Sequence, residues 1–215
     1  MRPGQPKANR YTRLTIVIHW LTLLVMIATF ATIELRVLFA KGTVAREEIK
    51  GWHFALGMVI LLMTIARMLN RAASKDRPPV SPAPPAWQRV LADGAHWVLY
   101  AALIGMPLLG WFTLSAAGKP VPLFFGVELP MLTGTDKALA KDLEALHKQI
   151  GSLLYYVIGL HAAAAIYHHV VRKDDTLRRM LPADRHTPGA AAGDHGYACG
   201  RDGLDHAAGE ARTQT

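Results

Sequence analysis

The sequence has 215 residues, 51% of them hydrophobic, and a formal net charge of +8. Its hydrophobic residues gather into stretches near the ~20 residues that cross a bilayer, which excludes an ordinary soluble domain. The basic residues flank these stretches rather than forming a nucleic-acid-binding run, and the single cysteine, Cys199, excludes internal disulfides and a covalent Cys-x-x-Cys-His haem site.

Four apolar stretches follow one another along the chain, at 14–33, 49–66, 97–117 and 150–171. They predict an all-α integral membrane four-helix bundle with antiparallel neighbours. The first stretch is longer than a signal-peptide core and lacks a small-x-small cleavage site, so we expect a retained helix. We expect a disordered lead at 1–10, the membrane domain at 11–182 and a disordered polar tail at 183–215. An acidic first turn at 142–144 is expected to open the last helix.

The basic residues are unevenly divided between the two sides of the predicted bundle. Fourteen lie in the N-terminal tail, in the connection between the second and third stretches, and just after the fourth stretch, whereas eight lie on the opposite side. Positive charge favours the cytoplasmic side of a membrane. The pattern therefore predicts that both termini are cytoplasmic.

Four histidines match one another in depth. His147 and His161 are fourteen residues apart on the last helix, which places them within about 40° of one face and about 21 Å apart along the axis. His53 lies near the outer end of its helix, as His147 does, and His19 lies on the inner half, as His161 does. Two such pairs suit the axial positions of two haem irons held between helices.

Other interpretations of these histidines stay open at this point. His168 lies on nearly the same face as His161, but it would lengthen the spacing from His147 to about 32 Å, so we prefer His161. Single intramembrane histidines are often only hydrogen-bonded between helices, and we interpret His96 as interfacial or structural. Binding of a divalent metal ion is disfavoured because the stretches contain no carboxylate except the interfacial Glu34 and Asp93.

Several stretches also carry a family resemblance. They are Arg13-Leu-Thr-Ile-Val-Ile-His-Trp20, Glu34-Leu-Arg36, Ile158-Gly-Leu-His-Ala-Ala-Ala-Ala-Ile-Tyr-His-His169 and Lys173-Asp-Asp-Thr-Leu-Arg-Arg-Met-Leu-Pro182. Over residues 10–182 the chain resembles the bacterial cytochrome b561 family. The resemblance implies a multi-pass protein of the bacterial inner membrane with two non-covalent b-type haems, whose axial ligands would be His19, His53, His147 and His161.

The family resemblance also implies an activity. Its short diheme members include superoxide:ubiquinone oxidoreductases, so we expect periplasmic superoxide as electron donor and the quinone pool as acceptor. Candidate residues for steering the superoxide anion are Arg36, Lys41, Arg46, Lys50, Lys119 and Lys148. Candidate quinone contacts are His168, His169 and Lys173. The alternatives are a quinol-linked carrier that reduces a redox partner protein, a cytochrome b anchor for a dehydrogenase, and a haem-free metal transporter.

Overall fold

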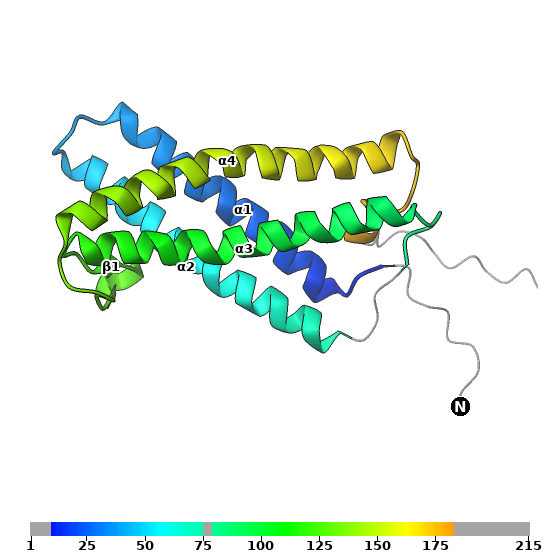
Figure 1. The fold of residues 1–215 in the computed structure, drawn as a ribbon, viewed down its shortest axis with the longest axis horizontal. Coiled ribbons are helices and arrows are strands. Elements are labelled where there is room, and N and C mark those ends of the chain that lie inside the picture. The colour runs from blue at the N-terminus through cyan, green and yellow to red at the C-terminus, as the bar shows by residue number, and fades with distance from the viewer. Residues whose placement is uncertain (1–9, 75–78, 183–215) are drawn as a thin grey trace, which may run out of the picture. The chain divides into compact units, whose positions relative to one another are not determined.

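A computed structural model describes residues 10–74 and 79–182; residues 1–9 of the expected lead and the expected tail at 183–215 lie outside these ranges. Four long helices make up most of the described chain (Figure 1): α1 Arg13–Leu35, α2 Val44–Ala73, α3 Ala86–Ala116 and α4 Lys137–Val170. Each is long and apolar enough to cross a membrane. The prediction of an all-α fold with four membrane-spanning helices is confirmed.

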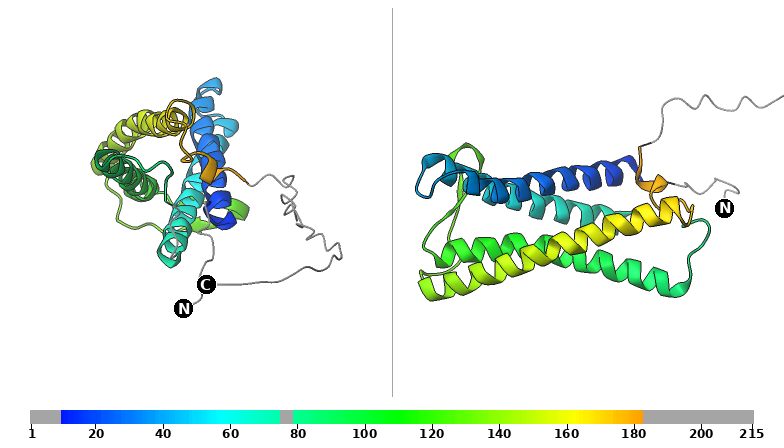
Figure 2. Two further views of the ribbon diagram at one scale, coloured as in Figure 1. Left: turned by 90° about the vertical axis from the view of Figure 1, so that its right-hand side faces the viewer. Right: turned by 90° about the horizontal axis from the view of Figure 1, so that it is seen from above.

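The four helices run back and forth between two ends of the bundle (Figure 2). α1 packs against α2, α2 against α3, and α3 against α4. One end, here called the hairpin end, holds two connections (Figure 1). They contain η1 Arg36–Leu38, and the antiparallel strands β1 Val121–Pro122 and β2 Glu128–Leu129 with η2 Phe124–Gly126 between them. The opposite end, here called the linker end, holds residues 10–12, 79–85 and 171–182.

The start of α4 differs from the sequence prediction. The Asp136 carboxylate accepts hydrogen bonds from the backbone N–H groups of Ala138 and Leu139, each at 3.0 Å. This N-cap satisfies two amides that would otherwise lack partners, so the helix begins at Lys137. The predicted acidic first turn at 142–144 is therefore wrong, because these residues lie inside the helix.

The second and third helices are also longer than their apolar stretches. α2 continues past the end of its apolar stretch at residue 66 to Ala73, so the Arg67 guanidinium belongs to the helix interior. α3 begins at Ala86 rather than at residue 97, which places His96 well inside the helix. Hydropathy finds the part of a helix that lies in the hydrocarbon core and not its polar ends.

The connection between α3 and α4 is fixed to the end of α3 by hydrogen bonds. Ser115 is fully buried, and its hydroxyl accepts a hydrogen bond from the backbone N–H of Leu132 at 3.0 Å. The backbone N–H of Asp136 donates to the carbonyl of Ala116 at 2.8 Å. These bonds hold the start of α4 beside the end of α3 and thereby set the height of α4 in the bundle.

Residues 171–182, here called the C-terminal strap, fold back over the linker end. The indole N–H of Trp20 in α1 donates to the carbonyl of Met180 at 2.7 Å. The backbone N–H of Ser81, in the α2–α3 connection, donates to the carboxylate of Asp175 at 3.0 Å. The strap therefore joins α1, the α2–α3 connection and the end of α4.

The strap contains a buried carboxylate, Asp174, which is only 4% exposed. It accepts hydrogen bonds from the His168 ring and from the backbone N–H of Thr176. Burial raises the pKa of the Asp174 carboxyl, but these hydrogen bonds lower it by more, so the resulting pKa is below its usual value. A carboxyl with a depressed folded-state pKa stabilises the fold above its unfolded-state pKa, and this stabilisation is lost as the pH falls through the folded-state value.

Substitution of Asp174 by asparagine should lower the free energy of unfolding by about 1–3 kcal/mol at neutral pH, because charged hydrogen bonds are lost at a buried site. The difference from the unsubstituted protein should shrink as the pH falls below about 4. Thermal unfolding of the detergent-solubilised protein at several pH values measures this. Asp142→Asn, on the exposed side of α4, is the control; equal effects of the two substitutions would contradict the prediction.

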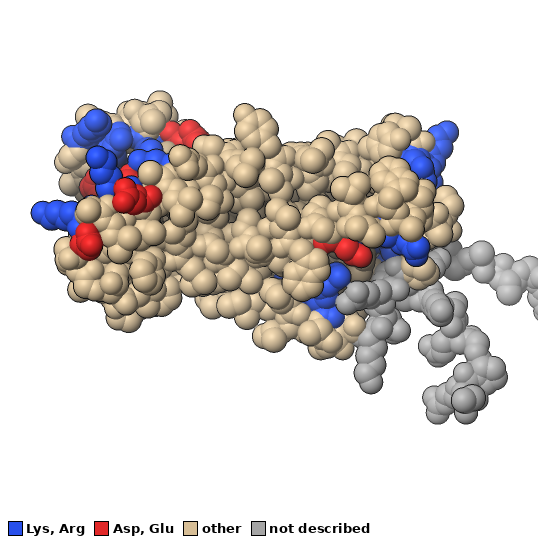
Figure 3. Space-filling view, viewed as in Figure 1, with Lys and Arg blue, Asp and Glu red and all other residues tan. Residues whose placement is uncertain are grey.

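The outer surface of the bundle suits a lipid environment. Outward-facing side chains remain mostly exposed, for example Leu24 at 61%, Leu62 at 66% and Leu160 at 73%. On the face seen in Figure 3, charged side chains lie toward the two ends and leave an uncharged band between them. The apolar band is what lipid chains would cover.

Candidate functional site

His53 of α2 and His147 of α4 meet inside the hairpin end. Their ring centroids are 6.3 Å apart, and the ring planes are inclined at 77°. The Nδ1 atom of His53 lies 3.0 Å from the carbonyl oxygen of Thr29. Because a carbonyl only accepts, this Nδ1 carries the proton and leaves the Nε2 lone pair free for a metal.

His19 of α1 and His161 of α4 form a second pair toward the linker end, with ring centroids 6.5 Å apart. Both rings line a cavity of about 70 Å³ that receives side chains from all four helices. The guanidinium of Arg67, also in its wall, lies 2.8 Å from His19 Nδ1. The cavity thus combines two facing imidazoles with a fixed positive charge.

An apolar layer separates the two histidine pairs. Met26, Ile60 and Leu103 form a buried cluster, against which Phe30 and Ile158 pack. α4 supplies one histidine of each pair, and its fourteen-residue spacing sets them about 21 Å apart along the helix. The fold thus brings together the two pairs that their matched depths predict: His53 with His147, and His19 with His161.

The two pairs fit axial ligation of an iron between them. Bonds of about 2 Å from one metal to imidazole nitrogens on opposite sides would place the ring centroids roughly 6 Å apart. The buried Nδ1 atom of His147 has no hydrogen-bond partner, which is consistent with a ligand-binding role for this ring. Among the described residues, no group of three His, Cys, Asp or Glu side chains could hold a metal ion alone. Paired imidazoles instead suit a metal whose equatorial ligands come from a macrocycle.

Comparison with known proteins supports the same chemistry. The model of the family described as prokaryotic cytochrome b561 matches residues 10–183. The chain belongs to this family. It is 35% identical over 177 residues to cytochrome b561 homolog 1 of Escherichia coli (strain K12), with 81% of this chain and 98% of that protein covered. It is 37% identical over 177 residues to the probable superoxide oxidase CybB of Yersinia pestis, with 82% of this chain and 98% of that protein covered.

As a cytochrome b561, the protein is a membrane protein that binds b-type haem and transfers electrons. A third relative, cytochrome b561 homolog 2 of E. coli (strain K12), is 28% identical over 182 residues, covering 80% of this chain and 92% of that protein. Membership of the family fits the two half-buried histidine pairs, and it fits a fold of four helices long enough to cross a membrane.

His96, which the sequence predicts to be interfacial or structural, lies beside the linker-end pair. Its ring centroid is 5.4 Å from that of His161, and its Nδ1 donates to the carbonyl of Ala92 at 2.6 Å. At this separation the two rings are closer than the spacing expected across a bound iron, whereas the 6.5 Å between His19 and His161 agrees with it. The amphipathic stretch 86–96 before the third apolar stretch is the signal that would have placed His96 in the helix.

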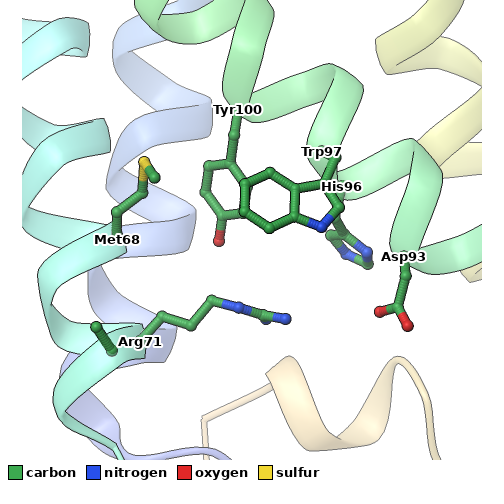
Figure 4. A pocket seen from close by; sticks show the side chains of 7 residues that line it. Met68, Arg71, Asp93, His96, Trp97 and Tyr100 are labelled. Atoms are coloured by element: carbon green, nitrogen blue, oxygen red, sulfur yellow. The ribbon is translucent and has the colours of Figure 1, made fainter.

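A second cavity, of about 220 Å³, lies between α2 and α3 next to the cytochrome's linker-end pair (Figure 4). Arg71 reaches into it from α2, and Asp93 and Trp97 line it from α3. His96 and Tyr100 line this cavity as well as the first one. These two side chains therefore form the wall between the linker-end histidine pair and a more open space.

The hairpin-end pair also depends on a close approach between α3 and α4. A Cβ atom added at Gly110 would lie 3.3 Å from His147 Cε1. This is tighter than ordinary van der Waals contact, so a larger residue at this position must displace the His147 ring. The same addition at Gly105, also in α3, would meet nothing within 4 Å.

If each histidine pair holds a haem, Gly110→Val should disturb the haem at the hairpin end and leave the other unchanged, because only His147 is pushed from its position. We expect a shifted midpoint potential, or partial loss, of one of two b-type signals in a spectroscopic redox titration. Gly105→Val carries the same cost of valine in a helix and should leave both signals intact. Equal behaviour of the two variants would show that the space beside Gly110 does not matter for the site.

Half of the predicted steering residues are occupied by other contacts. Arg46 donates to the carbonyls of Arg36 and Phe39, at 2.9 and 2.7 Å, which fixes the α1–α2 connection. Lys50 pairs with Glu47, and Lys148 pairs with Glu144. The remaining three candidates are Arg36, whose buried Nε has no hydrogen-bond partner, and the exposed Lys41 and Lys119.

The three candidate quinone contacts also differ from one another. His168 is held by Asp174 of the strap. His169 has a buried Nδ1 atom without a hydrogen-bond partner, and Lys173 is exposed with a left-handed backbone (φ 54°). Of these, Lys173 is exposed to another molecule, whereas the unpaired Nδ1 atom of His169 lies inside the bundle.

Proposed function

We propose that this cytochrome b561 oxidises superoxide at the hairpin end and reduces ubiquinone at the linker end, with both termini in the cytoplasm of a bacterial inner membrane. His53 and His147 would hold one haem, and His19 and His161 the other. The arrangement of two histidine pairs at two depths, joined by α4, carries this proposal. It is supported by 37% identity to a protein named as a probable superoxide oxidase.

The overall reaction converts two superoxide ions, one ubiquinone and two protons into two oxygen molecules and one ubiquinol. Bound haem supplies a one-electron carrier at each histidine pair. α4 would hold the two histidine pairs about 21 Å apart along its axis, with the apolar layer around Ile60 and Leu103 between them. Quinone chemistry needs protons, and the polar side chains at the linker end are suited to supply them.

The charge at the hairpin end supports superoxide as the donor. Superoxide is a small anion, and a field of positive charges raises its local concentration and its rate of encounter. Among the described residues, Arg36, Lys41 and Lys119 are the three predicted steering residues whose side chains form neither an ion pair nor a hydrogen bond. They would attract the anion toward His53 and His147.

Replacing both Lys41 and Lys119 with glutamine should slow superoxide-driven haem reduction several-fold at low ionic strength, because two unpaired charges are removed. The difference should vanish at high salt, where exposed charges are screened. Stopped-flow spectroscopy at two salt concentrations measures it. The double substitution Glu144→Gln with Lys148→Gln is the control, since it removes an ion pair without changing the net charge; an equal loss in the control would argue against steering by the free lysines.

The experiment that tests the proposed function is stopped-flow mixing of the oxidised cytochrome with superoxide, with and without ubiquinone. We expect rapid haem reduction by superoxide and reoxidation when ubiquinone is present, with formation of ubiquinol. Reduction by ubiquinol but not by superoxide would instead indicate a quinol-linked carrier. Reduction by neither would favour an anchor subunit that receives electrons from another protein.

A further inference from the structure

Arg67 is a charged residue in an unusual position. It lies in the interior of α2, six residues before the helix ends at Ala73, and it is half-buried. Its guanidinium donates to His19 Nδ1 at 2.8 Å and stacks 5.7 Å from the centre of the Tyr100 ring. The described residues form four ion pairs, and none involves Arg67. A guanidinium inside a membrane-spanning helix normally has an anionic partner or a functional role.

The hydrogen bond between Arg67 and His19 has a consequence for metal binding. A guanidinium only donates, so His19 Nδ1 must accept, and a neutral imidazole then carries its proton on Nε2. A protonated Nε2 has no lone pair to give to an iron. The contact with Arg67 and a metal bond at His19 Nε2 therefore exclude each other.

The hairpin-end pair has the opposite arrangement. His53 Nδ1 donates to the carbonyl of Thr29, which fixes the tautomer that binds a metal through Nε2. Its ring can thus accept a metal without any change of partner. At the linker end, by contrast, Arg67 needs another acceptor before His19 can take the same tautomer.

The cavity around the linker-end pair has no anionic acceptor for Arg67. Its described lining residues supply three imidazoles, the hydroxyls of Thr22 and Tyr100 and the Arg67 guanidinium, and no carboxylate. Haem brings its own carboxylates, and an arginine binds a carboxylate through two parallel hydrogen bonds. A haem carboxylate is therefore the anion that matches both the charge and the geometry of Arg67.

We propose that Arg67 anchors a carboxylate of the linker-end haem and, by leaving His19 Nδ1, allows His19 to bind the iron. The proton of the His19 imidazole moves from Nε2 to Nδ1 in this exchange, so no net charge is gained or lost. Arg67 is thus a positioning residue for one haem and not for the other. The inference rests on the ligand pairs of the proposed function.

The test measures how fast each haem leaves the purified full-length holoprotein in detergent, with excess apomyoglobin as haem acceptor. Arg67→Met should speed the release of one haem by roughly tenfold to a hundredfold, since a charged hydrogen bond is lost, and leave the other unchanged. Arg71→Met removes a charge one turn further along α2, beside the other cavity, and should leave both rates unchanged. Equal release rates for Arg67→Met and the unsubstituted protein would overturn the proposal.

A second measurement separates anchoring from a general loss of structure. Protein produced without haem should bind haem at both sites, whereas haem dimethyl ester, whose carboxylates are blocked, should bind one site roughly tenfold or more weakly. Arg67→Met should remove this preference for free carboxylates. The same preference in Arg67→Met and in the unsubstituted protein would overturn the proposal even if the variant bound haem poorly.

A third measurement uses the charge itself. Loss of a positive charge beside a haem favours the oxidised iron, so Arg67→Met should lower the midpoint potential of one haem, and Arg67→Lys should restore most of the shift. His161→Ala shows whether the affected haem is the one that this pair holds. If His161→Ala keeps both haems, the ligand assignment fails; if it loses one and Arg67→Met changes neither potential, only the anchoring role fails.

Discussion

Replacing His161 with alanine should reduce the haem content of the purified protein from two per chain to one, and replacing His147 should do the same. α4 supplies one imidazole to each pair, so on the proposed assignment each substitution would remove an iron ligand from one site and leave the other site, about 21 Å away, intact. The double substitution should abolish haem binding. A pyridine haemochrome assay against protein concentration measures these values.

His168→Ala is the matched control for that series. It removes an imidazole from the same helix, but the ring of His168 points to Asp174 of the strap and not to His19. Haem content should therefore stay at two per chain in this variant. Loss of a haem from His168→Ala together with full retention in His161→Ala would reverse the assignment of the two residues.

His19→Ala should also remove one haem, whereas His96→Ala should retain both. The structure places both rings against His161, but only the 6.5 Å separation of His19 leaves room for an iron between the rings. A visible spectrum and haem quantification of the two variants distinguish them. The electron paramagnetic resonance signal of the remaining haem identifies which site survives.

The opposite result would be equally clear. A protein that loses a haem in His96→Ala and keeps both in His19→Ala would have its linker-end iron between α3 and α4. In that case Arg67 would bind His19 permanently and could not act as a carboxylate anchor. The pair of variants therefore tests the ligand assignment and the premise of the Arg67 proposal together.

The helices and histidine pairs were predictable from the sequence because both follow from regular spacing. Apolar stretches of about 20 residues reveal where helices cross the bilayer, and fourteen residues on one helix fix both the face and the distance of His147 and His161. The ends of the helices were not predictable in this way. The N-cap at Asp136 and the polar beginning of α3 lie outside the apolar stretches, so hydropathy gave no sign of them.

The polar contacts of the site required the folded structure. Arg67 follows the second apolar stretch directly, where a snorkelling role is the ordinary expectation, and only the packing of α1 on α2 reveals its contact with His19. The apolar stretch that predicts the third helix begins at residue 97, whereas α3 begins at Ala86, so the contact of His96 with His161 was not predicted. The pairing of Lys50 with Glu47 and of Lys148 with Glu144 follows helical spacing and was available from the sequence.

The C-terminal strap has a consequence for how the protein is made. Its contacts join residues near both ends of the described chain, since Met180 accepts from Trp20 and the carbonyl of Arg179 accepts from the backbone N–H of Tyr11. Trp20 leaves the ribosome long before Met180 is synthesised. The contacts of the strap at the linker end therefore form last, after all four helices have been inserted. A chain that ends before the strap would lack these contacts.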